Sequence, residues 1–368
     1  MRGIVYDGEK ARVTDALEVR APGAGEVRIK VVAAGVCHSD QSVLDGTIPF
    51  PTPVVMGHEG AGIVEEVGSE VTTVKPGDHV VVATLANCGK CAPCGRGWPT
   101  RCRASMGNMT QPFTYEGKPA WNFAAASVFS EYTVVKEVQA VKIDDDVPLT
   151  AACLIGCGVV TGACCVWNRA RVQTGETAVV YGVGGVGLNV IQALRVARAS
   201  RIIAVDTVGA KEKFARQFGA TDFINPTETP DVVGAVRAMV PFSPTAAAGF
   251  MNAGGVDWAF DCVGHPAIIK DAIEMLDWGG NVVILGVPAP EVELTTLFAR
   301  LTHVDRGIMG CRYGSVRPHA DIPMIIDLYK SGQFMLDELV SATYPLEEFE
   351  TVLDDLHHGK LARGVLTF

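Results

Sequence analysis

A glycine-rich turn between an apolar strand and an amphipathic helix limits most what this chain can fold into. The string AVVYGVGGVGLNVIQALRVARA begins with a short apolar run that predicts a buried strand, and it continues with helical periodicity. Its turn has the pattern G-x-G-x-x-G, with glycines at Gly182, Gly184, Gly185 and Gly187. Such glycines let the backbone approach a pyrophosphate at the N-terminus of the helix. The turn therefore predicts an α/β unit that binds a dinucleotide.

Strands and helices continue to alternate after this turn. Short apolar runs predict strands at 201–206, 221–225, 256–264 and 281–287. Helical patterns predict helices at 211–220, 231–240 and 266–279. This alternation is typical of a doubly wound parallel sheet, and the fold class is therefore predicted to be α/β.

Asp206 follows the next strand, nineteen residues beyond Gly187. A carboxylate at this place can bind the ribose hydroxyls of adenosine, and it would repel a 2′-phosphate. The sequence therefore favours NAD over NADP. The alternative is a tight strand-to-helix turn that binds no ligand, which Asp206 and the surrounding alternation argue against.

Four of the eleven cysteines fall within one short segment, in a C-x2-C-x2-C-x7-C pattern. They are Cys88, Cys91, Cys94 and Cys102. Four thiolates at this spacing can close a tetrahedral shell around Zn²⁺ with no open position, which is typical of a structural site. An iron–sulfur cluster and disulfides are the alternatives. The odd number of cysteines disfavours a complete disulfide framework.

The first 150 or so residues contain short β-branched runs separated by turns, which predict a mixed or antiparallel, barrel-like β domain. A closing strand, GVLTF, is expected to return to this domain and make it discontinuous. We therefore expect a catalytic domain at 1–158, completed by 310–368, and a dinucleotide-binding domain at 159–309. Residues 241–255, with two prolines and several alanines and glycines, are expected to form a surface loop.

Composition and charge exclude several classes of protein. Hydrophobic residues make up 48% and charged residues 20% of the 368, so the chain is globular and not disordered. A formal charge of −10 argues against nucleic acid as a partner and favours small molecules. The start has no apolar signal segment, so a cytoplasmic location is expected. Residues 147–168 are uncharged and long enough to cross a bilayer, but their glycines, cysteines and small polar residues favour a buried helix and turn, with no membrane partner.

Three dispersed residues can form a second metal site. Cys37 follows a predicted strand, His58 precedes another, and Cys157 lies just before the dinucleotide unit. A buried cysteine or histidine taken singly is more often ordinary packing. Together they can supply two thiolates and one imidazole to zinc, and they would leave one position for water or substrate.

The chain resembles the zinc-dependent medium-chain alcohol dehydrogenases, of the medium-chain dehydrogenase/reductase family, along essentially its whole length. The matching strings are GVCHSD, GHEGAGIVEEVG, VKPGDHV, FSEYTVV, CLIGCGVVTG and GKLARGVLTF, together with the four-cysteine segment and the glycine turn with Asp206. The resemblance implies a GroES-like, β-rich catalytic domain and a Rossmann coenzyme domain. It also implies two zinc ions per chain, one structural and one catalytic, and NAD.

The resemblance implies roles for residues around the catalytic zinc. Cys37, His58 and Cys157 would hold the ion. Glu59 would lie behind it and could coordinate it during ligand exchange, and Asp40 would receive the second ring nitrogen of His58. Ser39 would accept the proton of the alcohol. The alternatives are ordinary turn carboxylates for the two acids and a serine that only caps a turn.

The resemblance also implies cofactor contacts. His38 and Arg363 would meet the pyrophosphate, Lys211 the adenosine ribose, and Thr161 and Val186 the nicotinamide, with exposed charge or plain packing as the alternative. Family members often carry a histidine five positions after the first zinc cysteine, where this chain has Ser42. The end of the proton relay is therefore left open. Four apolar residues after the four-cysteine segment at 88–102, called the lobe below, could line a roomy cleft or pack in the core, namely Met106, Met109, Trp121 and Phe123.

The implied function is an oxidoreductase that transfers a hydride between a primary or secondary alcohol and NAD, and gives an aldehyde or ketone. A homodimer or homotetramer is expected. Two other enzymatic activities are alternatives. One is a dehydrogenase of the hemithioacetal that formaldehyde forms with a thiol, and His38 is compatible with it. The other is a dehydrogenase that keeps its NAD bound through turnover. A cofactor-binding protein without catalysis is a further alternative, which the joint presence of Ser39 and the three ligands disfavours.

Overall fold

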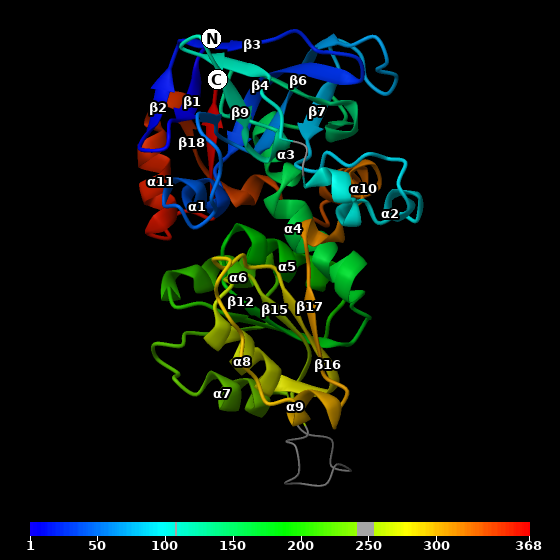
Figure 1. Ribbon diagram of the computed structural model, residues 1–368. Helices are drawn as coiled ribbons and strands as arrows, with labels where there is room; N and C mark the ends of the chain where they lie inside the picture. Colours follow the sequence, from blue (N-terminus) through cyan, green and yellow to red (C-terminus); the bar gives the residue numbers. More distant parts are fainter. Residues whose placement is uncertain (107–108, 241–253) are drawn as a thin grey trace. The chain divides into compact units, whose positions relative to one another are not determined.

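The computed structural model describes residues 1–106, 109–240 and 254–368. The chain divides into two compact units. The first unit comprises Met1–Val160 and Val316–Phe368, and the second comprises Thr161–Ser315 (Figure 1). Most of the expected loop at 241–255 lies outside the described residues.

The first unit is built mainly from strands. They are β1 (Gly3–Tyr6), β2 (Ala11–Thr14), β3 (Leu17–Val19), β4 (Glu26–Gly35), β5 (Val54–Val55), β6 (Glu59–Val67), β7 (His79–Val82), β8 (Phe113–Tyr115), β9 (Lys118–Asn122), β10 (Tyr132–Lys136), β11 (Ala140–Lys142), β18 (Val340–Pro345) and β19 (Arg363–Thr367). One sheet has the order β2-β1-β5-β9-β8-β3, and the other has the order β11-β7-β6-β4-β19-β18, with β10 paired to β4. The predicted β-rich, mixed architecture is confirmed.

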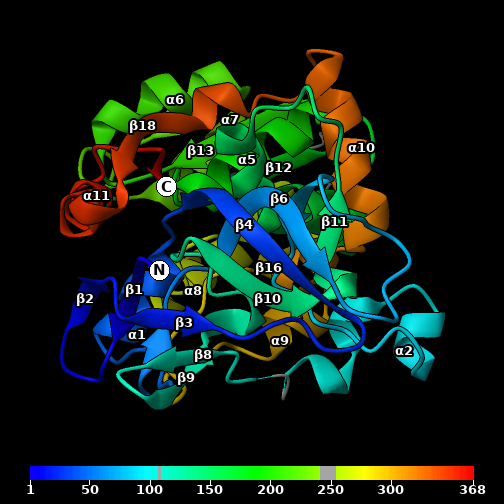
Figure 2. The same ribbon diagram turned by 90° about the horizontal axis from the view of Figure 1, so that it is seen from above.

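Strand β4 is the centre of the larger sheet, and Figure 2 shows it beside β6 and β10. Its sequence EVRIKVVAAG alternates partly buried and buried side chains, as expected for a strand with one face on the core. It pairs antiparallel with β6, with β10 and with β19. The pairing of β19 confirms that the closing strand returns to the first unit.

Helices of the first unit are few and mostly short. They are α1 (His38–Leu44), α2 (Ala92–Gly95), α3 (Leu149–Ala152), α10 (Pro318–Lys330) and α11 (Phe349–His357). Single turns of 3₁₀-helix lie at η1 (Pro99–Arg101), η2 (Arg103–Ser105), η3 (Phe123–Ala125), η4 (Glu137–Gln139), η5 (Cys153–Gly156), η9 (Asp337–Leu339) and η10 (Leu346–Glu348). Helix α4 (Gly158–Cys164) leads the chain out of this unit.

The second unit is a six-stranded parallel sheet with the order β14-β13-β12-β15-β16-β17. Its strands are β12 (Thr177–Tyr181), β13 (Arg201–Val205), β14 (Asp222–Ile224), β15 (Val256–Asp261), β16 (Leu276–Ile284) and β17 (Gly307–Gly310). Its helical segments are η6 (Cys165–Ala170), α5 (Gly185–Val196), η7 (Gly209–Lys211), α6 (Glu212–Phe218), α7 (Val232–Met239), α8 (Pro266–Met275), α9 (Ala299–Thr302) and η8 (Tyr313–Ser315). Figure 1 shows α5 and α6 on one side of the sheet and α7 and α8 on the other. This is the predicted doubly wound fold.

One predicted helix is shorter than the sequence indicates. The helical pattern was expected to run over 266–279, but α8 ends at Met275 and β16 begins at Leu276. Leu276 is fully buried, and it pairs in parallel with Val256 of β15. Pairing with a neighbouring strand therefore outweighs the local helical preference of this segment.

The apolar segment at 147–168 folds into short consecutive helices. No single helix among the described residues meets the length and composition needed to cross a membrane, and only the bent pair Leu149–Gly156 and Gly158–Ala170 meets them jointly. Most side chains of this segment are buried within the protein.

Candidate active site

Four potential metal ligands meet in the first unit. The ligand atoms of Cys37, His58, Glu59 and Cys157 all lie within 4.8 Å of one another. Cys37 follows β4 and precedes α1, His58 directly precedes β6, and Cys157 lies between η5 and α4. Because β4 and β6 are paired along their lengths, Gly35 lies opposite Glu59, and the two ends that carry Cys37 and His58 meet. The sheet therefore brings together residues that are far apart in the sequence.

His58 is oriented for metal binding. Its Nδ1 lies 3.1 Å from Oδ1 of Asp40, and the side chain is almost fully buried. Its Nε2 is buried and has no hydrogen-bond partner within the part of the chain that the structure describes. A buried nitrogen without a partner is costly, and two thiols beside it complete a donor set of the kind zinc prefers. The residues therefore fit a zinc ion.

Asp40 also holds the first cysteine. Its Oδ2 accepts a hydrogen bond from the backbone N–H of Cys37 at 3.0 Å, and its side chain is fully buried. Burial lowers the pKa of His58, but the negative charges of Asp40 and Cys37 raise it to about 10. Contact with Cys157 and with His58 lowers the pKa of Cys37. A thiolate at Cys37 and a protonated ring at His58 therefore stabilise each other.

Glu59 is held from two sides. Its carboxylate forms a buried ion pair with the guanidinium of Arg363, and its Oε1 accepts a hydrogen bond from the backbone N–H of Gly158 at 3.1 Å. Arg363 is therefore the ion-pair partner of Glu59 within the first unit. The partner of Glu59 was not apparent from the sequence, because the two residues are separated by 304 positions.

The residues of α1 around this cluster differ in exposure. Oγ of Ser39 lies 3.8 Å from Sγ of Cys37, and Ser39 is partly buried. His38 is exposed, and Ser42 is partly buried one turn further along the helix. Ser39 therefore has its hydroxyl group beside the ligand cluster.

The four cysteines of the lobe also converge. The ligand atoms of Cys88, Cys91, Cys94 and Cys102 lie within 4.8 Å of one another. The Sγ atoms of Cys91 and Cys94 are 3.5 Å apart, and the backbone N–H of Cys88 lies 3.4 Å from Sγ of Cys102. Backbone N–H groups lower the pKa of Cys88 to about 6, which favours the thiolate that a metal needs. Four thiols in one compact group fit a closed structural zinc site.

An aromatic pair adjoins the cluster of Cys37 and His58. The ring of Phe123 meets the imidazole of His58 edge to face, with centroids 5.2 Å apart. Phe50 meets Phe123 in the same way at 5.3 Å. Phe123 was identified from the sequence as a residue of a cleft or of the core. Phe50 was not identified, because it stands alone between prolines.

The other apolar residues after the lobe have different surroundings. Trp121 is partly buried and packs against the main core of the first unit. Met106 and Met109 are 72% and 43% exposed. Exposure of this extent is not core packing.

The glycine turn has the geometry that its sequence predicts. Gly182 has φ of +87°, and a Cβ at Gly187 would lie 1.8 Å from the carbonyl oxygen of Gly182. Helix α5 starts directly after Gly184. Side chains at Gly182 and Gly187 are therefore excluded, and the N–H groups at the start of α5 remain available to a phosphate.

Asp206 lies at the end of β13, beside this turn. Its carboxylate accepts hydrogen bonds from the backbone N–H groups of Val183 at 2.8 Å and Val208 at 2.9 Å, and Nζ of Lys211 lies 3.0 Å away. The structure thus brings Asp206 and Lys211 together at the glycine turn. This is the edge of a doubly wound sheet at which ligands bind.

Thr161 and Val186 lie close to the same turn. A Cβ at Gly162 would lie 2.4 Å from the carbonyl oxygen of Val186, so the segment after Thr161 packs tightly against the start of α5. Thr161 and Val186 are both partly buried.

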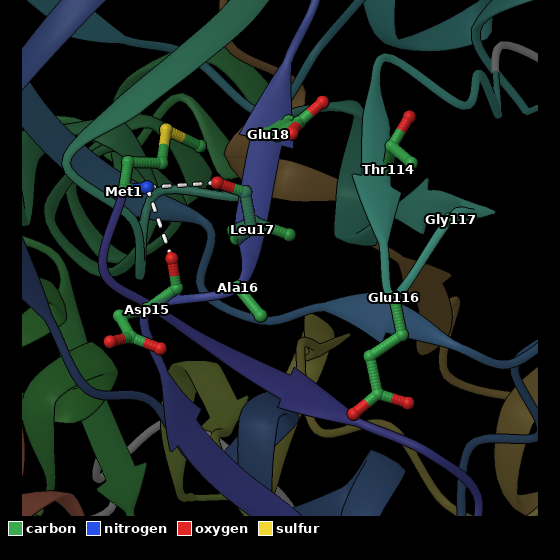
Figure 3. Close-up of a pocket in the computed structure, with 8 residues that line it drawn as sticks. All are labelled: Met1, Asp15, Ala16, Leu17, Glu18, Thr114, Glu116 and Gly117. Atoms are coloured by element: carbon green, nitrogen blue, oxygen red, sulfur yellow. Dashed lines mark hydrogen bonds between the residues drawn. The ribbon is translucent and has the colours of Figure 1, made fainter.

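A surface pocket of about 370 Å³ lies elsewhere in the first unit, between β3 and the turn that joins β8 to β9 (Figure 3). The amino group of Met1 donates hydrogen bonds to the carbonyl oxygens of Asp15 and Leu17 there. Glu18 and Glu116 also line it. It contains no member of either cysteine cluster.

Two protein-family models match parts of this chain. Residues 23–145 match the alcohol dehydrogenase GroES-like domain, and residues 185–331 match the zinc-binding dehydrogenases. S-(hydroxymethyl)glutathione dehydrogenase of Saccharomyces cerevisiae is 40% identical over 374 residues, which cover 99% of this chain and 95% of that protein. The protein of the same name from Paracoccus denitrificans is 37% identical, with 98% of each chain covered.

Solved structures agree with this result. Benzyl alcohol dehydrogenase from Acinetobacter calcoaceticus is 33% identical and superposes with a TM-score of 0.89, covering 100% of this chain and 99% of that one. An alcohol dehydrogenase zinc-binding domain protein from Burkholderia ambifaria is 34% identical, with a TM-score of 0.90, and covers 100% and 98%. The chain therefore belongs to the zinc-dependent medium-chain alcohol dehydrogenase family.

Proposed function

We propose that this enzyme, a zinc- and NAD-dependent oxidoreductase, converts a primary or secondary alcohol into an aldehyde or ketone at the cluster of Cys37, His58 and Cys157. In the reaction the carbinol carbon gives a hydride to NAD⁺ and the hydroxyl gives a proton to solvent, so the alcohol loses two electrons. The single observation that carries the proposal is the buried Nε2 of His58, which lacks a hydrogen-bond partner among the described residues and faces two thiols.

Each residue around the cluster has a proposed task. Zinc supplies a Lewis acid for the substrate oxygen when it is bound, and NAD supplies the hydride acceptor. Asp40 holds the Nδ1 proton of His58 and so keeps the lone pair of Nε2 directed at the ligand cluster. Ser39 accepts the proton of the alcohol, and its partial exposure supports transfer of that proton to solvent.

Glu59 has a positioning role in this proposal. Its charge is balanced by Arg363, and its position within 4.8 Å of the three ligand atoms allows it to approach the metal when a ligand leaves. Its bond to the backbone of Gly158 also holds the segment that carries Cys157. Arg363 is accordingly assigned to Glu59 in the first place, and a contact with the pyrophosphate would be additional.

The proposed cofactor site lies on the second unit. The glycine turn at 182–187 would receive the pyrophosphate, Asp206 and Lys211 the adenosine ribose, and Thr161 and Val186 the nicotinamide. His38 of α1 is proposed to meet the pyrophosphate because it is exposed. The division into a catalytic domain (1–158 and 310–368) and an NAD-binding domain (159–309) is supported by the two compact units.

We infer a homodimer or homotetramer from the edge of the second sheet. β17 is an edge strand, and Leu297 and Phe298, which precede it, are 64% and 77% exposed. A sheet edge without a paired strand among the described residues and large exposed apolar side chains on the same unit both favour association with a further copy of the chain. Light scattering on the purified protein tests this inference, and a monomeric mass would contradict it.

The first experiment measures zinc per chain together with NAD-linked oxidation of a panel of alcohols. Two zinc ions per chain and alcohol-dependent formation of NADH are expected. A chain that holds both zinc ions and NADH but oxidises no alcohol would contradict the proposed reaction.

A hemithioacetal of formaldehyde and a thiol is the second candidate substrate. It is supported by the two relatives above, which are named S-(hydroxymethyl)glutathione dehydrogenase. Formaldehyde with and without added glutathione, or another low-molecular-weight thiol, separates the candidates. A rate that depends on the thiol would favour the adduct, and a rate with simple alcohols alone would favour the first proposal.

A further inference from the structure

A buried carboxylate lies at the carboxyl ends of the parallel strands, in the middle of the sheet of the second unit. Asp261 ends β15, which lies between β12 and β16 (Figure 1). In the register of the sheet it is paired with Tyr181 on one side and with Ile284 on the other. Its side chain is fully buried. Asp261 has no task in the reaction proposed above, so its position calls for another explanation.

Asp261 holds the turn that follows β15. Its Oδ1 accepts hydrogen bonds from the backbone N–H groups of Val263 and Gly264, both at 3.0 Å, and its Oδ2 lies 3.1 Å from the nitrogen of Gly264. Burial raises the pKa of Asp261, whereas these N–H groups lower it. A carboxylate that is shielded from water depends on such donors. The buried charge and the turn therefore stabilise each other.

The same residue also holds the turn that follows β16. The backbone carbonyl oxygen of Asp261 accepts the N–H groups of Leu285 at 2.9 Å and Gly286 at 3.0 Å. A Cβ at Gly286 would collide with the backbone nitrogen of Gly264, so the two turns lie directly against each other. A displacement of the turn after β15 would therefore displace the turn after β16 as well.

The turn after β15 also contacts the glycine turn. The backbone N–H of Cys262 donates to the carbonyl oxygen of Tyr181 at 3.0 Å, and a Cβ at Gly182 would lie 2.8 Å from Cγ2 of Val263. Val263 is 50% exposed, and Val287, in the turn after β16, is 66% exposed. Exposed apolar side chains at this edge of a doubly wound sheet lie where a bound ligand can cover them.

We propose that Asp261 is a positioning residue for the cofactor, and that its carboxylate fixes the turns after β15 and β16 in the arrangement that binds NAD before the cofactor arrives. This inference rests on the proposed cofactor site and adds to it a residue that acts through these turns. A site whose loops are fixed in advance avoids the cost of ordering them on binding, so it binds its ligand more tightly. Loss of the carboxylate should therefore weaken the binding of NAD and NADH.

Asp261→Asn tests this role with little change in shape. An amide has a single acceptor oxygen, and it places an NH₂ donor against the N–H groups of the turn. If the binding arrangement is then populated only about one tenth of the time, the dissociation constant of NADH rises about tenfold. Titration of NADH fluorescence measures this constant. KM for NAD should rise by a similar factor, while kcat changes less.

Asp257→Asn is the matched control. Asp257 lies near the other end of β15, and its Oδ2 accepts hydrogen bonds from the backbone N–H of Thr177 at 2.7 Å and from the hydroxyl of Thr177 at 2.8 Å. The two carboxylates thus hold backbone at opposite ends of one strand. Both variants should lower the melting temperature, but only Asp261→Asn should weaken NADH binding. Equal weakening in the two variants would reflect a general loss of stability, and it would overturn the specific role of Asp261.

A second variant reaches the same turns without a change of the carboxylate. In Gly286→Ala the added methyl group pushes the two turns apart, and NADH should again bind about tenfold more weakly. Hydrogen exchange in the wild type needs no variant. The amides of 263–264 and 285–286 should exchange slowly before NADH is added. Fast exchange that slows only with NADH would mean that the cofactor orders the turns, and it would overturn the inference.

The outcomes separate this inference from the proposed function. If the wild type and Asp261→Asn bind NADH equally well, Asp261 has no positioning role and the proposed function stands. If Asp261→Asn binds NADH about tenfold more weakly but the wild type oxidises no alcohol, the positioning role stands and the proposed reaction fails. If the wild type does not bind NADH, the proposed cofactor site fails and the positioning role fails with it.

Discussion

One carboxylate, that of Asp40, joins two parts of the metal cluster. Oδ2 accepts the backbone N–H of Cys37 and Oδ1 faces Nδ1 of His58. Both contacts are buried, so neither is replaced easily by water. The first cysteine and the histidine are therefore positioned by the same side chain.

Replacing this carboxylate should weaken zinc binding. Asp40→Ala leaves Nδ1 of His58 without its partner, and we expect zinc affinity at the catalytic cluster to fall by about 10- to 100-fold. Competition with a chromogenic chelator measures the affinity, and the lobe zinc serves as the internal reference. Asp45→Ala, directly after the C-terminal end of the same helix and exposed, is the control. Unchanged affinity in Asp40→Ala would show that His58 is oriented by other contacts.

Asp206 should set the choice of nucleotide. In Asp206→Ser the partners of Val183 and Lys211 are lost, and the repulsion of a 2′-phosphate disappears. We expect kcat/KM for NAD to fall at least about tenfold and NADP to become a substrate. Steady-state kinetics with both nucleotides gives the ratio. Asp222→Ser, at the start of β14, is a control at a distance from the turn. If the ratio did not change, Asp206 would not contact the ribose.

The parts of the site that depend on residue type and spacing could be predicted from the sequence. The cysteine spacing and the glycine turn are of this kind, and their residues converge as expected. The left-handed turn after Phe123 could not be predicted, because alanine gives no signal for such a backbone. The pair of Glu59 and Arg363 was equally hidden, since only the tertiary fold joins residues so far apart.

At the scale of elements, the cysteine lobe is a segment that has little core of its own. It comprises α2, η1 and η2, and most of its residues from 89 to 104 are exposed or partly exposed. A segment with so little buried apolar surface needs another source of stability. Zinc held by four thiolates supplies it.

Removal of one lobe ligand should therefore destabilise this segment. Cys94→Ser is expected to lose one zinc per chain, to lower the melting temperature and to make the lobe sensitive to proteolysis. Cys153→Ser is the control, because Cys153 is buried but its Sγ lies near the carbonyl oxygen of Thr150 and not in either cluster. Mass spectrometry under native conditions counts the zinc. Retention of two zinc ions in Cys94→Ser would refute the structural site.

A second element, η4, ties down the loop before β7. Oε1 of Glu137 accepts the backbone N–H groups of Thr72 and Thr73, both at 2.6 Å. Burial raises the pKa of Glu137, but these hydrogen bonds outweigh burial and lower it below its ordinary value of 4.5. A carboxyl with a lowered pKa stabilises the fold above its unfolded pKa, and this stability is lost as pH falls through the lowered value.

Glu137→Gln tests the direction of this dependence of stability on pH. At pH 7 the variant should be less stable by about 1 kcal/mol, since charged acceptors form stronger hydrogen bonds than neutral ones. The difference from the wild type should shrink as pH falls below 4.5. Urea unfolding at several pH values measures it. A difference that grows on acidification would contradict the assigned direction.

At the scale of the whole molecule, each unit has its own buried core. One core gathers around β4, β6 and β10, and another lies between the parallel sheet and α7 with α8. The sequence predicted both architectures because hydrophobic periodicity and strand–helix alternation are local signals. The predicted end of α8 was wrong, because it depends on the pairing of Leu276 with β15, which is not a local interaction.

Separate cores predict separate responses to ligands. NADH should raise the temperature at which the second unit unfolds, because it binds only the folded state. Removal of zinc by a chelator should lower the unfolding temperature of the first unit. Calorimetry combined with hydrogen exchange assigns each change to its residues. A chelator effect confined to 161–315 would contradict the placement of both metal sites in the first unit.

The position of β19 has a consequence for synthesis. This strand follows the whole second unit along the chain, yet it lies between β4 and β18 in the sheet of the first unit. Chains emerge from the ribosome N-terminus first, at about 5–20 residues per second. Residues 161–315 are thus complete while the first unit still lacks an inner strand, and Arg363 has not yet reached Glu59. Translation must pass through the entire nucleotide unit before the metal-binding unit can close its sheet.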